Sequence, residues 1–333
     1  MPRHRGQLEK PPNIAAPIKK IYISLISFVV LLSWALMHDV ARQLYVNSLN
    51  ANSSWPMWYA EPASRFQGQP IGASKSLCGS TGTSAERAAR LRAKVASGLL
   101  KFESRRTGGN RLPKNFDSAE HWPSCYKVIS DIRDQSNCGC CWAFGTAEAA
   151  SDRLCIATNG TIALPLSAQE LCFCQQADGC DGGLPEDAWQ YIQAAGLATG
   201  GQFNSTGPFQ GMCADFSLPH CHHHGPQGID PYPAEGKPGC PLVKSSPQCP
   251  TDCGAGTKTQ YADFKHDRFK FLGYLQMYDN DADTIARAIL DSGPISASFD
   301  VYDDFENCKQ RRRIEAQGTS AVMLCCQHVT HAL

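Results

Sequence analysis

The longest apolar run of the chain lies near its N-terminus, downstream of a cluster of basic residues. It begins at Ile21, ends at Met37 and contains no charged residue. Its length of about 17 residues is at the lower limit for a membrane-spanning helix and slightly long for a signal-peptide core. We therefore expect residues 1–37 to be a cytoplasmic basic segment with a signal peptide or an anchor, and the rest to enter the lumen. A buried core helix is the alternative.

Shorter periodic segments further along predict helices. The Ala-rich stretch 141–155 predicts one of them. The segment Ser167-Ala168-Gln169-Glu170 is a capping box, which typically opens a short helix. Pro185 and Gly196 bracket a further helix, because proline is favoured in the first turn and glycine after the last.

The pattern of residue types changes twice in the C-terminal half. Residues 207–256 are dominated by Gly, Pro and Cys, which predicts a long loop held by crosslinks rather than by a core. The pattern then resumes as a helix at 282–294 and as an alternating strand at 295–305. No clear periodicity follows Glu306, so we expect 307–333 to be a tail.

A polar stretch, 38–111, separates the apolar run from the globular part, which begins at residue 112. Within it, 84–100 is rich in Ala and Arg and predicts a basic amphipathic helix. The stretch ends in RRTGGNR (105–111), where basic residues surround a Gly-Gly pair. This sequence is typical of an exposed linker that proteases cut easily, although a simple surface loop fits equally well.

Composition indicates a compartment more than a fold. The chain has 333 residues, and Lys plus Arg equals Asp plus Glu at 31 each, so no overall charge favours nucleic acid as a partner. Its 17 cysteines indicate an oxidising compartment, and their odd number leaves at least one outside intrachain disulfides. Asn52, Asn159 and Asn204 begin glycosylation triplets, which would be acceptors if exposed there.

Three cysteines fall within four residues in the stretch NCGCCWAFG (137–145). Cys141 begins a predicted helix, where the helix dipole favours a thiolate and hence a nucleophile. Gln135 lies six residues upstream and offers an amide donor for an oxyanion. A disulfide or metal cluster is the alternative, although adjacent Cys140 and Cys141 fit tetrahedral zinc poorly. The stretch by itself leaves catalysis and structure equally open.

Several motifs occur together in one order: RDQSNCGCCWAFG, SDRLCIATN, GCDGGLPEDAW, GLATGGQF, HCHHHG and SFDVYDDF. The combination resembles papain-like cysteine peptidases, and within them cathepsin B-like members of trypanosomatid type. The resemblance implies an α+β, papain-like two-domain fold, disulfide-rich, with a helical left domain and a β-barrel-like right domain that is incomplete here. It also implies a propeptide and linker at 38–111 and a peptidase domain at 112–306.

Site residues follow from this resemblance by position. It implies Cys141 as the nucleophile, with the Gln135 amide and the Cys141 backbone N–H as oxyanion donors. A substrate would be bound by residues beside the nucleophile and in the GCDGGLP motif: Trp142, Gly182, Gly183 and Pro185. Two histidines, His223 and His224, match a loop that occludes the far end of the cleft, and Asp134 would anchor that loop through His223.

Disulfides are implied in the same way. The implied pairs are Cys125–Cys155, Cys138–Cys180, Cys213–Cys253 and Cys221–Cys240, with Cys249 joined to Cys172 or Cys174. Cys140 departs from the family, which usually has serine there. A thiol at this position either sensitises the nucleophile to oxidation or simply packs.

The base that such a cysteine needs is the open question. The family places its histidine in a GGHA strand and an orienting asparagine in an NSW segment, and neither motif occurs in this sequence. His331 and His328, in the final QHVTHAL, are weak substitutes because a terminal residue is more often frayed than positioned. We therefore expect a C-terminally truncated peptidase precursor of impaired activity.

Three functions remain after this reasoning. The leading one is peptide-bond hydrolysis through a Cys141 thiolate and an acyl-enzyme, with peptides as substrates, the chain's own propeptide as inhibitor and no cofactor or metal. The second is a non-catalytic lumenal relative that binds peptides or inhibitors. The third, zinc binding by HCHHH, is the weakest. Expected locations are a lysosome-like compartment or the outside of the cell, with a membrane partner if Ile21–Met37 is not cleaved.

Overall fold

A computed structural model gives the fold. It describes residues 15–52, 60–62, 68, 70–72, 78–81, 84–103, 111–175, 178–203, 208–219, 246–258, 263–272, 275–278 and 282–298, without side chains for 15–32, 52, 84, 102, 103 and 275–278. The helices and strands, in chain order, are α1 (Ala15–Asn52), α2 (Ser84–Ala96), β1 (Leu100–Glu103), α3 (Ser118–His121), η3 (Pro123–Cys125), α4 (Tyr126–Ile129), α5 (Cys141–Ala157), α6 (Ala168–Cys174), η4 (Gly179–Asp181), α7 (Pro185–Ala195), β2 (Leu275–Tyr278) and α8 (Ala282–Ser292).

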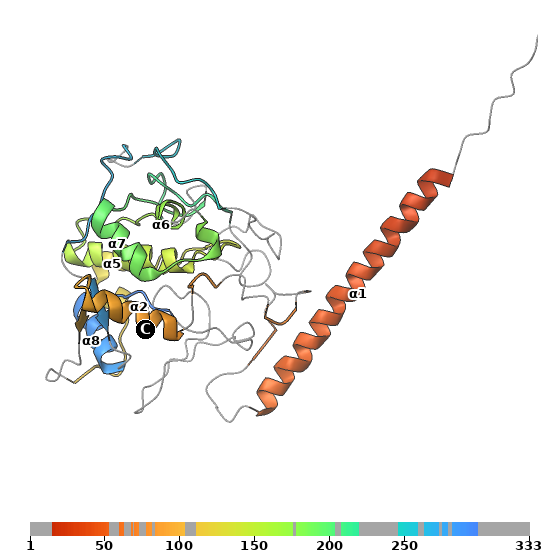
Figure 1. Cartoon of the computed structure of the whole chain (residues 1–333), viewed down its shortest axis with the longest axis horizontal. Helices are drawn as coiled ribbons and strands as arrows, with labels where there is room; N and C mark the ends of the chain where they lie inside the picture. The colour runs from red at the N-terminus through yellow and green to blue at the C-terminus, as the bar shows by residue number, and fades with distance from the viewer. Residues whose placement is uncertain are drawn as a thin grey trace, which may run out of the picture.

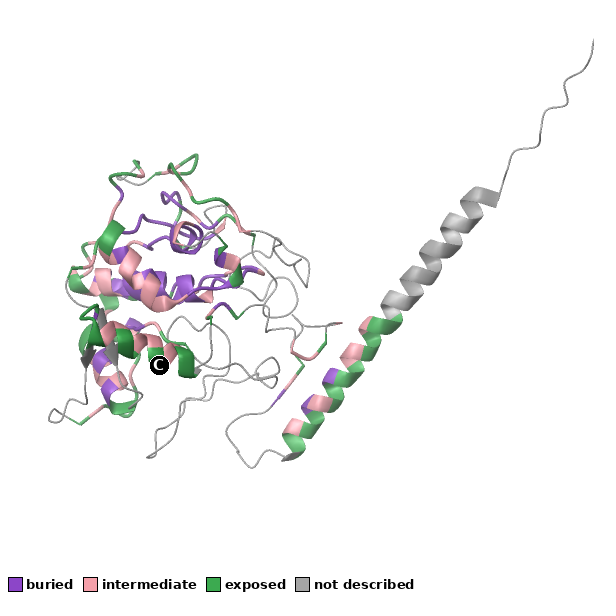
Figure 2. Cartoon of the chain, viewed as in Figure 1, coloured by how far each residue is buried: buried purple, intermediate pink, exposed green. Residues whose placement is uncertain are grey.

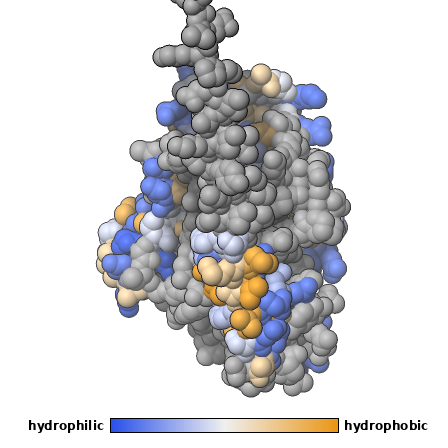
Figure 3. Space-filling model, turned by 90° about the vertical axis from the view of Figure 1, so that its right-hand side faces the viewer, coloured by the Kyte–Doolittle hydropathy of each residue, from blue (hydrophilic) through white to orange (hydrophobic). Residues whose placement is uncertain are grey.

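Helix α1 contains the predicted apolar run and continues well beyond it. It has 38 residues and extends away from the other elements (Figure 1). Its described side chains include large apolar residues that are at least half exposed, among them Leu36 and Leu44. Figure 3 shows a hydrophobic patch beside hydrophilic residues on the side of the molecule where α1 lies. Among the helices of the described part, none is long and apolar enough to cross a membrane.

Helix α5 is the centre of the core. Its buried residues lie on all sides because most are small, and Ala143, Ala147 and Ala150 are completely buried. Such a helix can be surrounded by neighbours, and α6 and α7 both pack against it. Figure 2 shows that buried residues concentrate around α5 and α6. The prediction of a helix from residue 141 is thus confirmed.

The helix-end signals operate as the sequence predicts, with one exception. The Ser167 hydroxyl accepts a hydrogen bond from the Glu170 backbone N–H at 3.0 Å, and Pro185 is the first residue of α7. Gly196 ends α7 with φ of 78°, a conformation that favours glycine. The exception is the Glu170 carboxylate, which accepts from the Ala198 N–H and the Tyr191 hydroxyl rather than closing the capping box. Its burial between α6 and α7 explains this choice, because a buried carboxylate needs several donors.

The polar N-terminal stretch is joined to the C-terminal half by a small sheet. The strands β1 and β2 are parallel, with Leu100 opposite Leu275 and Glu103 opposite Tyr278. Helix α2 ends at Ala96, earlier than predicted, because the chain turns at Gly98 into β1. Helix α8 is present as predicted. Residues 295–298 are not a strand, and the rest of the predicted strand lies outside the described residues.

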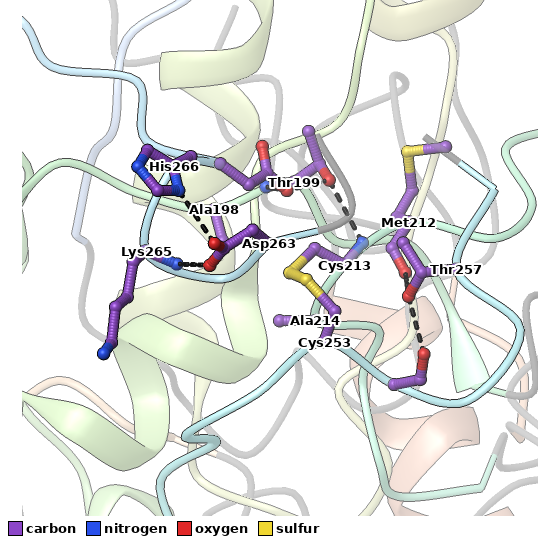
Figure 4. The surroundings of a disulfide bond; sticks show 12 residues. Ala198, Thr199, Met212, Cys213, Ala214, Cys253, Thr257, Asp263, Lys265 and His266 are labelled. Carbon is purple, nitrogen blue, oxygen red and sulfur yellow. Dashed lines mark hydrogen bonds and ion pairs between the residues drawn. A yellow bond between two sulfur atoms is a disulfide. The ribbon is translucent and has the colours of Figure 1, made fainter. Parts of the chain in front are cut away.

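Five disulfides occur in the described part, and three of them are pairs that the family resemblance implies. They are Cys125–Cys155, Cys138–Cys180 and Cys213–Cys253. Figure 4 shows the last of these, where the Cys213 N–H donates to Thr199 Oγ1 at 3.1 Å. The implied Cys221–Cys240 pair lies outside the described residues.

The remaining two disulfides decide between Cys172 and Cys174. Cys249 is joined to Cys174, with Cα atoms 4.7 Å apart, so of the two alternatives that the resemblance implies, Cys174 is confirmed and Cys172 is wrong. Residues two apart on a helix point in nearly opposite directions. Cys172 therefore faces the core and is completely buried, where it is joined to Cys140. Cys140 is thus part of a disulfide, rather than a thiol that sensitises Cys141 to oxidation or a side chain that only packs.

A buried charged cluster lies beneath α5. The Arg133 guanidinium donates to the Leu166 carbonyl at 2.7 Å and forms an ion pair with Asp131 at 3.3 Å. Glu148 and Asp152, on α5, are also buried. Burial raises the pKa of Asp152 to about 8, against the lowering effect of the Arg133 charge.

Candidate functional site

Cys141 is the first residue of α5, and the preceding residues hold it there. The Cys140 carbonyl accepts hydrogen bonds from the Ala143 and Phe144 N–H groups, at 2.9 and 3.1 Å. The Cys140–Cys172 disulfide ties this turn to α6, and Cys138–Cys180 ties the preceding loop to η4. The position of the Cys141 sulfur is therefore fixed by backbone and crosslinks on both sides.

A segment from the polar N-terminal stretch, residues 78–81, covers this sulfur. The Gly79 N–H donates to Cys141 Sγ at 3.1 Å. The same segment pairs in parallel with the backbone of Gly183: Gly183 N–H donates to the Gly79 carbonyl at 2.7 Å, and Thr81 N–H donates to the Gly183 carbonyl at 3.2 Å. It thus lies between the nucleophile turn and the GCDGGLP motif.

The close approach depends on glycines. A Cβ on Gly79 would lie 1.9 Å from the Gly139 carbonyl oxygen, and one on Gly183 would lie 2.4 Å from the Trp142 ring. Gly182 has φ of 105°, and its Cβ would meet the Gly79 carbonyl oxygen at 2.8 Å. A side chain at any of these positions would push the segment and the site apart.

The environment of the sulfur differs from that expected of a helix N-terminus. Burial raises the pKa of the Cys141 thiol above its usual value. Backbone N–H groups, with that of Gly79 first among them, act in the opposite direction but do not outweigh burial. In this covered state Cys141 is held as a thiol, so the sequence-based expectation of a thiolate does not apply while the segment is in place.

The other predicted site residues lie around the same turn. The Gln135 amide donates to the Cys138 carbonyl at 3.0 Å, which holds the side chain against the nucleophile loop. Trp142 is buried and donates from its indole N–H to the Gly179 carbonyl at 3.2 Å. Asp134 accepts from the Ser136 N–H at 2.6 Å. Pro185 begins α7 just after Gly183.

The histidines that the sequence singles out cannot be placed. His223, His224, His328 and His331 all lie outside the described residues. The histidines of the described part contact other residues: His38 meets Trp34 edge to face, His121 packs against Trp122, and His266 pairs with Asp263.

Two features of the site escaped sequence reasoning. One is the role of residues 78–81, although the Cys78-Gly79 pair within SKSLCGS was the available signal. The other is the pairing of Cys140 with Cys172. Its only signal in the sequence is that Cys140 adjoins Cys141 and that Cys172 lies close to Cys174.

A contact between the Ser80 and Ser298 hydroxyls, 3.0 Å apart, also joins residues 78–81 to the C-terminal half.

A cysteine cluster beside the site has the composition of a metal site. The sulfurs of Cys138, Cys140 and Cys172 lie within 4.8 Å of one another. Each belongs to a disulfide, and a disulfide sulfur is not the thiolate that binds zinc. The cluster is therefore a pair of neighbouring crosslinks.

Known proteins resemble this chain in sequence and in structure. The model of the papain family cysteine proteases matches residues 112–311. A cathepsin B-like cysteine proteinase of Schistosoma japonicum is 42% identical over 201 residues, which are 60% of this chain and 54% of that protein. Cathepsin B-like cysteine proteinase 6 of Caenorhabditis elegans is 36% identical over 200 residues, 59% of this chain and 48% of that protein.

A solved structure extends the similarity to the N-terminal part. The structure of proCathepsin B S9 from Trypanosoma congolense has a TM-score of 0.52 and 26% identity, over 80% of this chain and 74% of that one. The two proteinases above are matched over only about half of their own length. The fold is papain-like, α+β and crosslinked by several disulfides. With Cys141 inside the matched region, the chain belongs to the papain family of cysteine proteases.

Proposed function

We propose that this chain is the inactive precursor of a cathepsin B-like cysteine peptidase. The observation that carries the proposal is the position of Cys141 at the start of α5, covered by residues 78–81 through the Gly79–sulfur hydrogen bond. In this arrangement residues 38–111 are a propeptide with its linker, and 112–306 belong to the peptidase domain. Similarity to a proCathepsin B structure over 80% of the chain supports the same division.

The reaction follows from the residues around Cys141. Once uncovered, the thiolate would attack a peptide carbonyl, while the Cys141 N–H and the Gln135 amide stabilise the oxyanion. Expulsion of the amine leaves an acyl-enzyme, which water hydrolyses. Gly182, Gly183 and Pro185 would hold an extended peptide, because the Gly183 N–H and carbonyl already pair with an extended segment. The substrates are peptides or proteins, and no step needs a metal or cofactor.

Residues 78–81 would inhibit by occupying this place without being cut. The group that faces Cys141 Sγ is the Gly79 N–H, at 3.1 Å, which is a donor and not an electrophile. The backbone of Gly183 is occupied by the same segment. The raised pKa of the Cys141 thiol adds to the effect, because the thiol is a poor nucleophile.

Catalysis also needs a base, and here a second function competes. The Gly183 N–H and carbonyl pair with an extended segment, and this arrangement also fits a relative that binds peptides without hydrolysing them. His331 is the weak candidate for the base in the printed sequence, and removal of the histidine from a comparable hydrolase costs on the order of 10⁶ in turnover. His223, His224 and Asp134 would restrict the far end of the cleft in either function.

An active-site probe separates the two functions. The secreted full chain is treated with a protease that cuts at 105–111 and is then labelled with an epoxysuccinyl probe, beside Cys141→Ser. Labelling that is lost in Cys141→Ser and in His331→Ala supports a peptidase with His331 as its base. Folded, soluble protein without labelling, which still binds peptides, supports the binding function and contradicts the peptidase. The disulfides of the described part are consistent with a lysosomal or extracellular location.

A further inference from the structure

Two cysteines of the described part lie outside its five disulfides, and the covering segment brings them together. They are Cys78, which is exposed, and Cys141, which is half-buried. Gly79, the immediate neighbour of Cys78, is the residue whose N–H donates to Cys141 Sγ at 3.1 Å. The inhibitory segment thus presents a second thiol beside the nucleophile that it covers.

Peptide geometry sets the distance between them. In a trans peptide the N–H of Gly79 and the Cα of Cys78 lie on the same side of the C–N bond. With standard bond lengths, a sulfur 3.1 Å along that N–H is about 4 Å from the Cys78 Cα. A cysteine side chain with an S–S bond of about 2.05 Å spans this distance after a χ1 rotation. The backbone hydrogen bonds with Gly183, from its N–H to the Gly79 carbonyl at 2.7 Å and from the Thr81 N–H to its carbonyl at 3.2 Å, hold the segment in place.

We propose that Cys78 is a redox-reactive site and that it forms a disulfide with Cys141 in the precursor. The oxidant is a low-molecular-weight disulfide. The exposed Cys78 thiolate attacks it, forms a mixed disulfide and releases one small thiol. The Cys141 thiol then loses its proton, and the thiolate attacks the Cys78 sulfur, forms the intrachain S–S bond and releases the second small thiol. The two cysteine thiols are oxidised by two electrons, the small disulfide is reduced by two, and the two protons end on the released thiols.

The consequence is covalent inhibition that a cut in the linker does not release. After proteolysis at 105–111, the segment stays bound to the nucleophile until a thiol reductant breaks the bond. The proposal rests on the proposed role of residues 78–81 as the occupant of the site. Its test needs no peptidase activity, so the two can fail separately.

Tryptic mapping without reductant tests the bond directly. The purified full chain is incubated with glutathione disulfide, alkylated and digested. Trypsin cuts after Lys75 and Arg87, which isolates fragment 76–87 with Cys78 as its one cysteine. We expect this fragment to be lost from the free peptides, to be joined to fragment 134–153 with Cys141, and to return on reduction. Alkylation of Cys141 should be lost with it.

Two variants serve as controls. In Cys141→Ser, fragment 76–87 should run free and carry glutathione; in Cys78→Ser, glutathione should be found on Cys141. If the fragment stays joined to the crosslinked core in Cys141→Ser, Cys78 has exchanged with a structural disulfide and the proposal is wrong. It is equally wrong if oxidised wild-type protein carries glutathione on Cys78 while Cys141 remains open to alkylation. The wild-type result alone decides the question should either variant not fold.

Discussion

At the scale of single residues, the site depends on glycines, whose lack of a Cβ lets neighbouring groups pack closely. Gly79 and Gly139 let their backbones approach each other and the Cys180 carbonyl, and Trp142 fills the space that a side chain at Gly183 would need. The GG pair of the sequence predicts a close backbone approach, but it does not say which segment approaches. That information comes from residues 78–81, over a hundred positions away, and no local pattern encodes such a pairing.

Gly183→Ala should destabilise the folded chain by about 1–3 kcal/mol, because its Cβ would overlap the buried Trp142 ring. Gly254→Ala is the matched control, since its Cβ meets only the Cys213 carbonyl oxygen at 3.7 Å. Chemical denaturation followed by tryptophan fluorescence measures both. Equal midpoints for the two variants would show that the ring moves aside without cost.

Asp152 should make stability depend on pH. Burial raises its pKa from 3.8 to about 8, so the folded chain binds a proton that the unfolded chain releases between these values. The free energy of unfolding therefore falls as pH rises from about 4 to about 8 and levels off above. Asp152→Asn should lose this pH dependence. Its free energy of unfolding relative to wild type should therefore be higher at pH 8 than at pH 5. If the difference in free energy of unfolding between the variant and the wild type is the same at pH 5 and pH 8, the raised pKa of Asp152 is contradicted.

At the scale of elements, helices were predictable where local signals set their ends. Helices α5 and α7 begin at the predicted residues, Cys141 and Pro185, because small residues and a first-turn proline act locally. The β1–β2 pair was not predictable, since its strands are four residues each and lie far apart in sequence. The choice of Cys174 over Cys172 for Cys249 also depends on which face of α6 meets the core, which the spacing alone left open.

Helix α6 depends on its N-cap. Ser167→Ala removes the acceptor for the Glu170 N–H and the hydroxyl that donates to the Ala214 carbonyl at 2.7 Å. We expect a loss of about 1–2 kcal/mol, because the cap is buried. Ser97→Ala, at an exposed hydroxyl after α2, should change stability by less than about 0.5 kcal/mol. Thermal unfolding compares them, and an unchanged Ser167→Ala would mean that water replaces the cap.

At the scale of the whole molecule, the N-terminal stretch is attached to the body at several separate places. Residues 79–81 pair with Gly183, Lys94 of α2 forms an ion pair with Asp187 of α7, and β1 pairs with β2. The ion pair is partly exposed and contributes only about 0–1 kcal/mol. The attachment is therefore mainly a matter of backbone pairing, which a cut elsewhere in the chain does not remove.

Limited trypsin digestion should cut first in RRTGGNR, and the two fragments should stay together on gel filtration under reducing conditions. Thr81→Pro should weaken their association about tenfold, because it leaves the Gly183 carbonyl unpaired at a cost of about 1–3 kcal/mol. Thr81→Ala keeps the backbone N–H and is the matched control. Fragments that separate at once in the wild type would show that the contacts hold only in the uncut chain.

The contact of Gly79 with Gly139 also bears on which sequence changes this chain can inherit. A Cβ at position 79 would lie 1.9 Å from a backbone oxygen, so every replacement would lift the segment from the sulfur. Ser80 and Thr81 are at least partly exposed and have room to vary. Position 79 therefore tolerates only glycine while the segment stays against Cys141, whereas positions 80 and 81 accept other side chains that keep the backbone N–H of residue 81.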